Sequence, residues 1–162
     1  MLRISRLTDY ATVILASLAE QPERVQTATA VAEATHLALP TVSKLLKQLQ
    51  RTKLVISTRG THGGYQLARP ATEITAAHIL DALEGPVALT DCASARSQCG
   101  IEGTCRVGRA WQKVNIAIRR SLHEVTLAQL AGLDAIQPRL PTLDREMQAV
   151  VARKPRPNLN DL

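Results

Sequence analysis

Hydrophobic positions in the first third of the chain follow a helical period in three successive stretches. Residues 7–20, 27–35 and 40–52 each place apolar side chains three or four positions apart. Thr8 and Thr27 stand where a threonine caps a first helical turn, and the third stretch opens with a proline, which fits such a turn. We therefore predict three consecutive helices. The core face of the third helix should consist of Val42, Leu45, Leu46 and Leu49.

The period then changes from helix to strand. Residues 54–58 are rich in β-branched side chains, and residues 65–68 can pair with them across the tip RGTHGG. The glycines of this tip permit the positive φ angles of a tight turn. Three helices followed by a hairpin are the order of a winged helix-turn-helix.

The second half of the chain adds further helices and a cysteine-containing segment. Residues 75–84 form a fourth predicted helix, which ends at Gly85 and Pro86. A long helix begins near Gly108. The expected fold is therefore mainly α with a small β-hairpin wing, a winged helix-turn-helix followed by a long C-terminal dimerisation helix. The expected division is 1–85 for the winged unit, 86–107 for a cysteine loop, 108–133 for the long helix and a short one, and 134–162 for a partly disordered tail.

Positive charge is concentrated in the winged part of the chain. The net charge is +6; residues 1–70 hold nine Lys/Arg and four Asp/Glu, giving +5, whereas residues 71–133 hold six of each. This distribution indicates a polyanionic partner such as double-stranded DNA. No apolar run approaches the ~20 residues of a membrane span, and no secretory signal is evident. We therefore expect a cytoplasmic protein without a membrane partner.

The outward face of the third helix carries small and cationic side chains, which suit a major groove. Thr41, Ser43 and Lys44, near the start of the helix, are the candidates for reading base edges. Lys47 and Arg51 are better placed to neutralise phosphates. Taken alone, the same face also fits a solvated amphipathic helix.

The wing favours DNA binding over that plain reading. Arg59 at the tip can enter a narrow minor groove, where the negative potential is strongest. His62 lies close by, and Gly63 and Gly64 allow the backbone to approach phosphates. A glycine-rich tip can also be a simple turn. The three preceding helices and the local charge nevertheless favour a DNA-binding wing.

A dimer is expected because one winged unit reads too few base pairs for genomic specificity. The long helix carries an apolar stripe that can supply the contact between subunits. Packing of this stripe against the chain's own core is the alternative. The stripe consists of Trp111, Val114, Ile118 and Leu122.

All three cysteines, Cys92, Cys99 and Cys105, lie within fifteen residues and are separated by six and five residues. A disulfide would leave one thiol over and is uncommon in the cytosol. Structural zinc usually takes close pairs such as C-x2-C. Free cysteines are a third reading, and an iron–sulfur cluster held by thiolates on a glycine-containing loop is a fourth. The spacing alone leaves these readings open.

Three motifs together resemble the Rrf2 family of bacterial winged-helix regulators. They are MLRISRLTDYA at the start, LVISTRGTHGGYQLAR in the wing, and the C-x6-C-x5-C loop followed by Trp111. The resemblance covers roughly residues 1–133 and is closest to the branch that regulates the SUF operon for cluster assembly. It implies a cluster in the cysteine loop whose state controls DNA binding by a homodimer.

The resemblance also suggests the ligands. Some members place a histidine three residues after the third cysteine, but Gly108 stands there in this chain and cannot ligate. The nitric-oxide-sensing branch uses an aspartate from the partner subunit, and Asp9 matches its position. Asp9 can otherwise be a helix N-terminal residue that interacts with the dipole. His36 and Glu102 are weaker candidates. Three thiolates and a carboxylate favour [4Fe–4S], with [2Fe–2S] as the alternative.

We expect a transcription regulator, a repressor of SUF genes that senses cluster status. The alternative is a thiol-switched, zinc-switched or nitric-oxide-responsive winged-helix regulator of other genes. A cluster carrier whose winged domain contacts protein is disfavoured by the local positive charge. No enzyme is expected, since the chain shows no phosphate-cradling loop and no motif of catalytic Ser, Thr or His residues.

Overall fold

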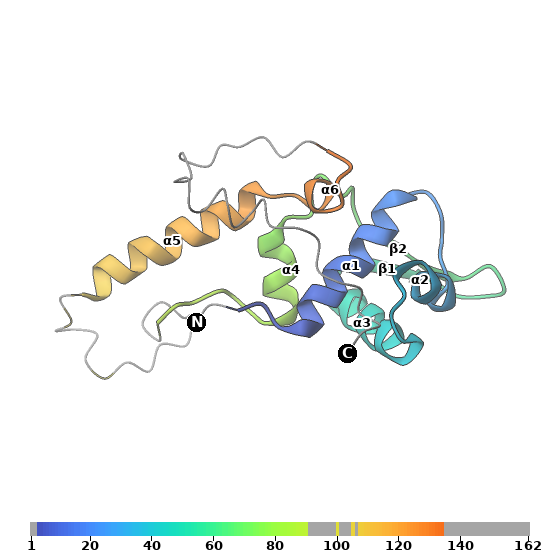
Figure 1. Ribbon diagram of the computed structural model, residues 1–162, viewed down its shortest axis with the longest axis horizontal. Coiled ribbons are helices and arrows are strands. Elements are labelled where there is room, and N and C mark those ends of the chain that lie inside the picture. Colours follow the sequence, from blue (N-terminus) through green and yellow to red (C-terminus); the bar gives the residue numbers. More distant parts are fainter. Residues whose placement is uncertain (1–2, 91–99, 101–104, 106, 135–162) are drawn as a thin grey trace.

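The computed structural model describes residues 3–90, 100, 105 and 107–134. Within these residues the order is three helices, a two-stranded antiparallel hairpin, and three further helices (Figure 1). This arrangement confirms the predicted mainly α fold with a small wing. The elements are α1 (Arg6–Glu20), α2 (Ala28–Thr35), α3 (Leu39–Arg51), β1 (Val55–Thr58), β2 (Gly64–Leu67), α4 (Ala76–Leu83), α5 (Gly108–Glu124) and α6 (Leu127–Leu130).

The helix starts agree with the sequence except at α1. Thr27 caps α2, because its side chain accepts a hydrogen bond from the Ala30 N–H at 3.1 Å. The prediction that Thr8 caps α1 is wrong, since the Ser5 side chain accepts from the Thr8 N–H at 3.2 Å. The Thr8 hydroxyl is buried and donates to Glu84, at the end of α4. Thr8, predicted to cap α1, therefore joins α1 to the end of α4.

The core lies among α1, α2, α3 and the hairpin. All four predicted core positions of α3 are buried, as are Ile14, Leu15 and Leu18 of α1. Leu127 of α6 is fully buried in the same cluster, because α6 packs against α1. The core contains leucine, isoleucine, valine and alanine, as expected for a chain without phenylalanine.

The hairpin is fixed by its register and by a third chain segment. Val55 pairs with Leu67 at one end, and Thr58 pairs with Gly64 at the tip. Beyond this ladder, the Gln26 N–H donates to the Tyr65 carbonyl at 2.9 Å, and the Tyr65 N–H donates to the Gln26 carbonyl at 2.7 Å. The wing is therefore held by the connection between α1 and α2 as well as by its own strands.

α5 extends from the winged unit as an arm, and the hairpin lies at the opposite end of the molecule (Figure 1). α4 contacts α5 and also packs against α1 and α3. Among the described residues of α5, only Asn115 is buried. The arm therefore contacts the winged unit through α4, and this contact buries little apolar surface of α5.

Candidate functional site

The outward face of α3 presents cations that no acidic residue of the helix offsets. Lys44, Lys47 and Arg51 are exposed, whereas Thr41 and Ser43 are half-buried on the same helix. The three cations follow spacings of three and four residues, so they share a face. The structure therefore brings together the five candidates that the sequence proposed on α3, in a helix whose opposite side is in the core.

The tip of the wing exposes Arg59 and His62 to solvent. The Gln50 side-chain amide near the end of α3 donates to the Ser57 hydroxyl of β1 at 2.7 Å. This bond fixes the wing relative to α3, which supports their action as one surface.

Gly63 and Gly64, proposed from the sequence as phosphate contacts, have an internal reason to be glycine. A Cβ at Gly63 would lie 2.3 Å from the Thr58 carbonyl oxygen. A Cβ at Gly64 would lie 2.5 Å from the Gln26 carbonyl oxygen. Both glycines therefore permit close backbone packing in the wing, and their contact with DNA stays a prediction.

Of the proposed thiol ligands, only Cys105 lies in the described part of the chain; Cys92, Cys99 and Glu102 lie outside it. Cys105 is a half-buried free thiol just before α5. An ideal Cβ at Gly108 would lie 3.7 Å from the Cys105 Sγ. A side chain at position 108 would thus be in ordinary van der Waals contact with this sulfur. Among the described residues, no three His, Cys, Asp or Glu side chains gather as a metal site.

Asp9 is exposed in the first turn of α1, close to the end of α4, where Glu84 binds Ser5 and Thr8. The start of α5, three residues after Cys105, lies at the far end of the arm, away from the start of α1, which bears Asp9 (Figure 1). One subunit therefore does not bring Asp9 and Cys105 together. His36 is exposed at the end of α2 with a φ of 56°, so it occupies the left-handed turn before α3.

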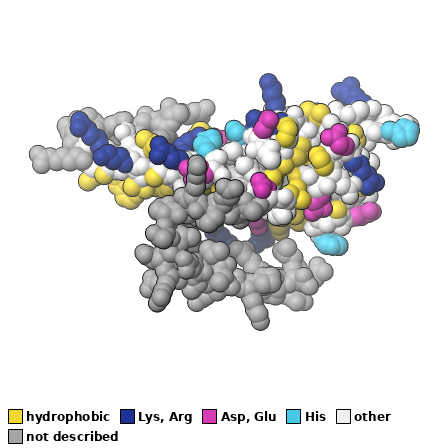
Figure 2. Space-filling view, turned by 90° about the horizontal axis from the view of Figure 1, so that it is seen from above, with side chains coloured by type: hydrophobic (Ala, Val, Ile, Leu, Met, Phe, Trp, Pro, Cys, Tyr) yellow, Lys and Arg dark blue, Asp and Glu magenta, His cyan; other side chains and the backbone are white. Residues whose placement is uncertain are grey.

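The apolar stripe of α5 is exposed in its first half. Trp111 is 45% and Val114 is 43% exposed, whereas Ile118 and Leu122 are half-buried. Figure 2 shows hydrophobic side chains along one edge of the arm, next to Lys and Arg side chains. Trp111 and Val114 are consequently exposed in a single chain, whereas the half-buried Ile118 and Leu122 agree in part with packing inside the chain. Contact of this stripe with a second chain stays a prediction.

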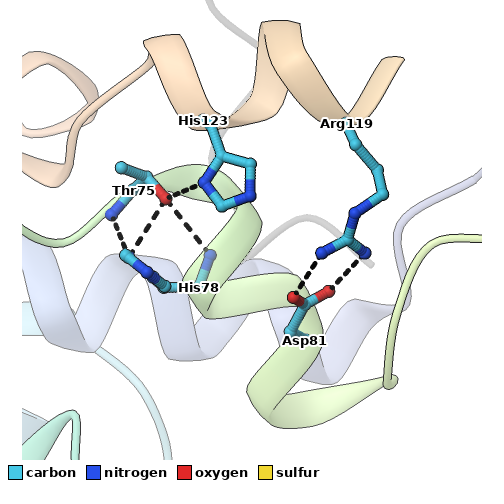
Figure 3. Close-up of polar contacts among 5 residues, drawn as sticks. All are labelled: Thr75, His78, Asp81, Arg119 and His123. Carbon is cyan, nitrogen blue, oxygen red and sulfur yellow. Dashed lines mark hydrogen bonds and ion pairs between the residues drawn. The ribbon is translucent and has the colours of Figure 1, made fainter. Parts of the chain in front are cut away.

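A polar cluster between α4 and α5 was missed from the sequence (Figure 3). Arg119 donates to both carboxylate oxygens of Asp81, at 3.2 and 3.0 Å. The rings of His78 and His123 meet edge to face, with 5.7 Å between centroids. The T-x-x-H pattern at Thr75 resembles a capping box and was a usable signal for His78. The contact of Asp81 with Arg119, far along the chain, left no such signal.

The chain matches a known protein family over most of its length. The model of the Rrf2 family, described as an iron-dependent transcriptional regulator, matches residues 4–132. Protein rrf2 of Nitratidesulfovibrio vulgaris is 29% identical over 133 residues, which cover 80% of this chain and 87% of that protein. No helix among the described residues is long and apolar enough to cross a bilayer.

Two solved structures resemble the whole described architecture. CymR, the global cysteine regulator of B. subtilis, matches with a TM-score of 0.64 and 27% identity, over 83% of this chain and 99% of CymR. IscR of T. potens matches with a TM-score of 0.61 and 27% identity, over 87% of this chain and 93% of IscR. The match therefore extends beyond the winged unit into the arm.

Proposed function

This chain belongs to the Rrf2 family of transcriptional regulators, and from this premise we propose that it is a repressor of SUF cluster-assembly genes that senses cluster status through a bound iron–sulfur cluster. One observation carries the proposal most: all three cysteines fall between α4 and α5, within the 129 residues from 4 to 132 that match a family described as iron-dependent. The winged-helix regulators of this family bind DNA, so the cluster would act through the DNA-reading surface.

α3 and the wing form the proposed DNA contact. Thr41, Ser43 and Lys44 would read base edges in the major groove. Lys47 and Arg51 would neutralise phosphates, and Arg59 would enter the minor groove. Next to Arg59, the wing residues His62, Gly63 and Gly64 would contact the phosphate backbone of the DNA. The exposure of the cations and the absence of acidic residues from α3 support this assignment.

Two chains are proposed to form the active regulator. Trp111 and Val114 offer exposed apolar surface on α5, which suits contact with the α5 helix of a second copy. A dimer would also supply Asp9 from the partner subunit to the cysteines, which agrees with the separation of Asp9 and Cys105 within one chain.

Cys92, Cys99 and Cys105 are the proposed thiolate ligands, with Asp9 as the fourth. The half-buried free thiol of Cys105 beside the start of α5 supports its assignment as a ligand. A [4Fe–4S] cluster is favoured and [2Fe–2S] is the alternative; His36 and Glu102 are the alternative ligands. A carboxylate is a weaker ligand for iron than a thiolate, so one iron of the bound cluster would be labile. Such a cluster would be degraded by oxygen, by nitric oxide or when iron is scarce, and this loss would be the signal.

The likeness to CymR favours a second candidate. CymR is a cysteine regulator of the same architecture, which favours a regulator of genes other than those of cluster assembly. The runner-up is therefore a thiol-switched, zinc-switched or nitric-oxide-responsive winged-helix regulator of such genes. Purification without oxygen separates the two. A brown protein with iron and acid-labile sulfide supports the cluster, whereas a colourless protein containing zinc supports the runner-up.

The DNA contact is tested by footprinting on the promoters of neighbouring genes at several salt concentrations. Replacing Lys47 or Arg51 by alanine should lower the slope of log affinity against log salt by about one per cation. Lys44→Ala should instead weaken the preference for the promoter over other DNA. Arg59→Ala should weaken binding, and Lys113→Ala, an exposed cation on the arm, is the matched control. A footprint indifferent to Lys44, Lys47 and Arg59 would refute the proposed docking.

The fourth ligand is tested by the lifetime of the cluster in air. Asp9→Ala should shorten that lifetime and leave the circular dichroism spectrum unchanged. Glu20→Ala removes a carboxylate at the other end of the same helix and should have no effect. An unchanged lifetime in Asp9→Ala would point to His36 or Glu102.

A further inference from the structure

Two capping boxes begin α4 and α6, and they differ in one chemical respect. At α4, the Thr75 side chain accepts from the His78 N–H at 3.3 Å, and the His78 Nδ1 accepts from the Thr75 N–H at 3.1 Å. At α6, the Thr126 side chain accepts from the Gln129 N–H at 3.2 Å, and the Gln129 Oε1 accepts from the Thr126 N–H at 2.9 Å. The two boxes share their geometry, but only the first contains a titratable side chain.

The two boxes are also joined to each other. Thr75 and Thr126 form an isolated antiparallel bridge. Across it, the Ala76 N–H donates to the Val125 carbonyl at 2.8 Å, and the Leu127 N–H donates to the Ile74 carbonyl at 2.6 Å. The start of α4 is therefore the place where the winged unit meets the end of the arm.

The hydrogen bond at His78 fixes the protonation state that the cap requires. A backbone N–H can only donate, so the Nδ1 of His78 must carry a lone pair and no proton. Proton uptake on Nδ1 would place two N–H groups against each other and remove the bond from the Thr75 N–H. The Thr75 hydroxyl oxygen, 3.1 Å from Nδ1, is then the acceptor that the protonated ring has within reach. The Gln129 amide is not titratable, so the box of α6 survives at any pH at which the chain folds.

The surroundings of His78 oppose its protonation. Burial lowers the pKa of His78 from its ordinary 6.5, the positive charge of Arg69 and the neighbouring His123 lower it further, and Asp81 raises it. Asp81 is itself paired with Arg119 of α5, which limits its effect. α1 and α3 also pack against α4, but no charged side chain of either helix contributes to the lowered pKa of His78.

We propose that His78 makes the junction between α4 and α5 sensitive to pH, since a proton on its Nδ1 opens the cap of α4 and loosens the contact of α4 with the arm. The ring of His123 on α5 contacts that of His78, and the His123 Nδ1 lies 3.5 Å from the Thr75 hydroxyl oxygen, so a change at the cap reaches α5 directly (Figure 3).

The sign of the effect follows from the direction of the pKa shift. A histidine whose pKa is lower in the folded chain binds its proton more readily in the unfolded chain. Its contribution to stability is complete above its ordinary value of 6.5 and is lost as pH falls from there through the lower folded value. Acidification should therefore weaken the junction, and neutral pH should close it.

The test compares the full-length wild type with His78→Gln and His62→Gln. Glutamine at position 78 keeps the acceptor, as Gln129 does at α6, but removes the titration. His62→Gln removes an exposed histidine on the wing and is the matched control. Between about pH 7.5 and about pH 5.5, the Tm of wild type and His62→Gln should fall by about 2–4 °C more than that of His78→Gln. Amide exchange in the first turn of α4 and the last turn of α5 should accelerate about fivefold in the same two proteins.

An equal fall in Tm for wild type and His78→Gln would overturn the proposal. Nitrogen NMR of the wild type gives a second test that does not depend on the variant's folding. It should show the Nε2–H tautomer of neutral His78 near pH 7.5 and a pKa below 6.5. A proton on Nδ1 of the neutral ring, or a pKa at or above 6.5, would also overturn it.

Discussion

Replacing Gly64 with alanine should detach the wing from the connection between α1 and α2. The new Cβ would lie 2.5 Å from the Gln26 carbonyl oxygen and 3.0 Å from the Val25 Cγ1. The Gln26 backbone cannot move aside without disturbing its two hydrogen bonds with Tyr65, of 2.9 and 2.7 Å. Steric relief and the loss of these bonds therefore occur together.

The expected cost follows from those two contacts. A buried backbone hydrogen bond contributes about 1 kcal/mol net, and overpacking by one methyl group costs about 1–3 kcal/mol. Since the strand can relieve the overlap by giving up the bonds, the two terms are not additive, and we expect a loss of about 2–3 kcal/mol. For a chain of this length the Tm should fall by about 5–10 °C.

Thermal unfolding followed by circular dichroism measures this loss, and Gly108→Ala is the matched control. That substitution makes the same chemical change, but its Cβ meets Cys105 atoms at 3.7 and 3.8 Å, which is ordinary contact. Its Tm should stay within about 2 °C of wild type. Gly64→Ala should also weaken the promoter footprint, because the wing moves. Equal melting temperatures for the two variants would refute the steric reasoning.

The remaining predictions concern the core and two contacts between helices. Leu46→Ala, at a fully buried position of α3, should cost about 2–5 kcal/mol in urea unfolding, and a loss below about 1 kcal/mol would contradict its place in the core. A double-mutant cycle on Asp81 and Arg119, whose side chains are about one-third exposed, should give a coupling of about 0.5–1 kcal/mol that shrinks with salt; a coupling unaffected by salt would exclude a screened ion pair. Glu84→Ala should cost at most about 1 kcal/mol near neutral pH, because the carboxylate accepts from Ser5 and Thr8. These bonds lower the pKa of Glu84, so the difference from wild type should vanish as pH falls through that lowered value, and a difference that persists in acid would argue against it.

The sequence was sufficient for elements whose signals are local. The period of Val42, Leu45, Leu46 and Leu49 marks the buried face of α3, and the glycine-rich tip between β-branched runs marks the wing. Both signals depend on neighbours within a few positions, where side-chain spacing and backbone preference act directly.

Contacts between distant segments could not be predicted in the same way. Thr8 has the composition of an N-cap, but its hydroxyl is taken by Glu84, 76 residues away. Asp81 and Arg119 are 38 residues apart and carry no pairing signal in the chain. The role of Gly64 depends on the approach of Gln26, which only the folded backbone reveals.

The same distinction between local and distant signals applies to the candidate site. Exposure on α3 and at the wing tip agrees with the surface proposed from charge and spacing. The proposed ligand set combines Cys105 and Asp9, which one chain holds apart, with Cys92 and Cys99, which lie outside the described residues. The proposed ligand set therefore requires a second subunit and a cofactor, and neither is specified by local sequence.

The most direct measurement is the iron and acid-labile sulfide content of the full chain prepared without oxygen, read together with its promoter footprint before and after exposure to air. We expect iron and sulfide in equal amounts, about four of each per chain for the favoured cluster, and a footprint that changes when they are lost. Protein that takes up neither element even under reconstitution, or whose footprint is the same with and without them, would contradict cluster sensing.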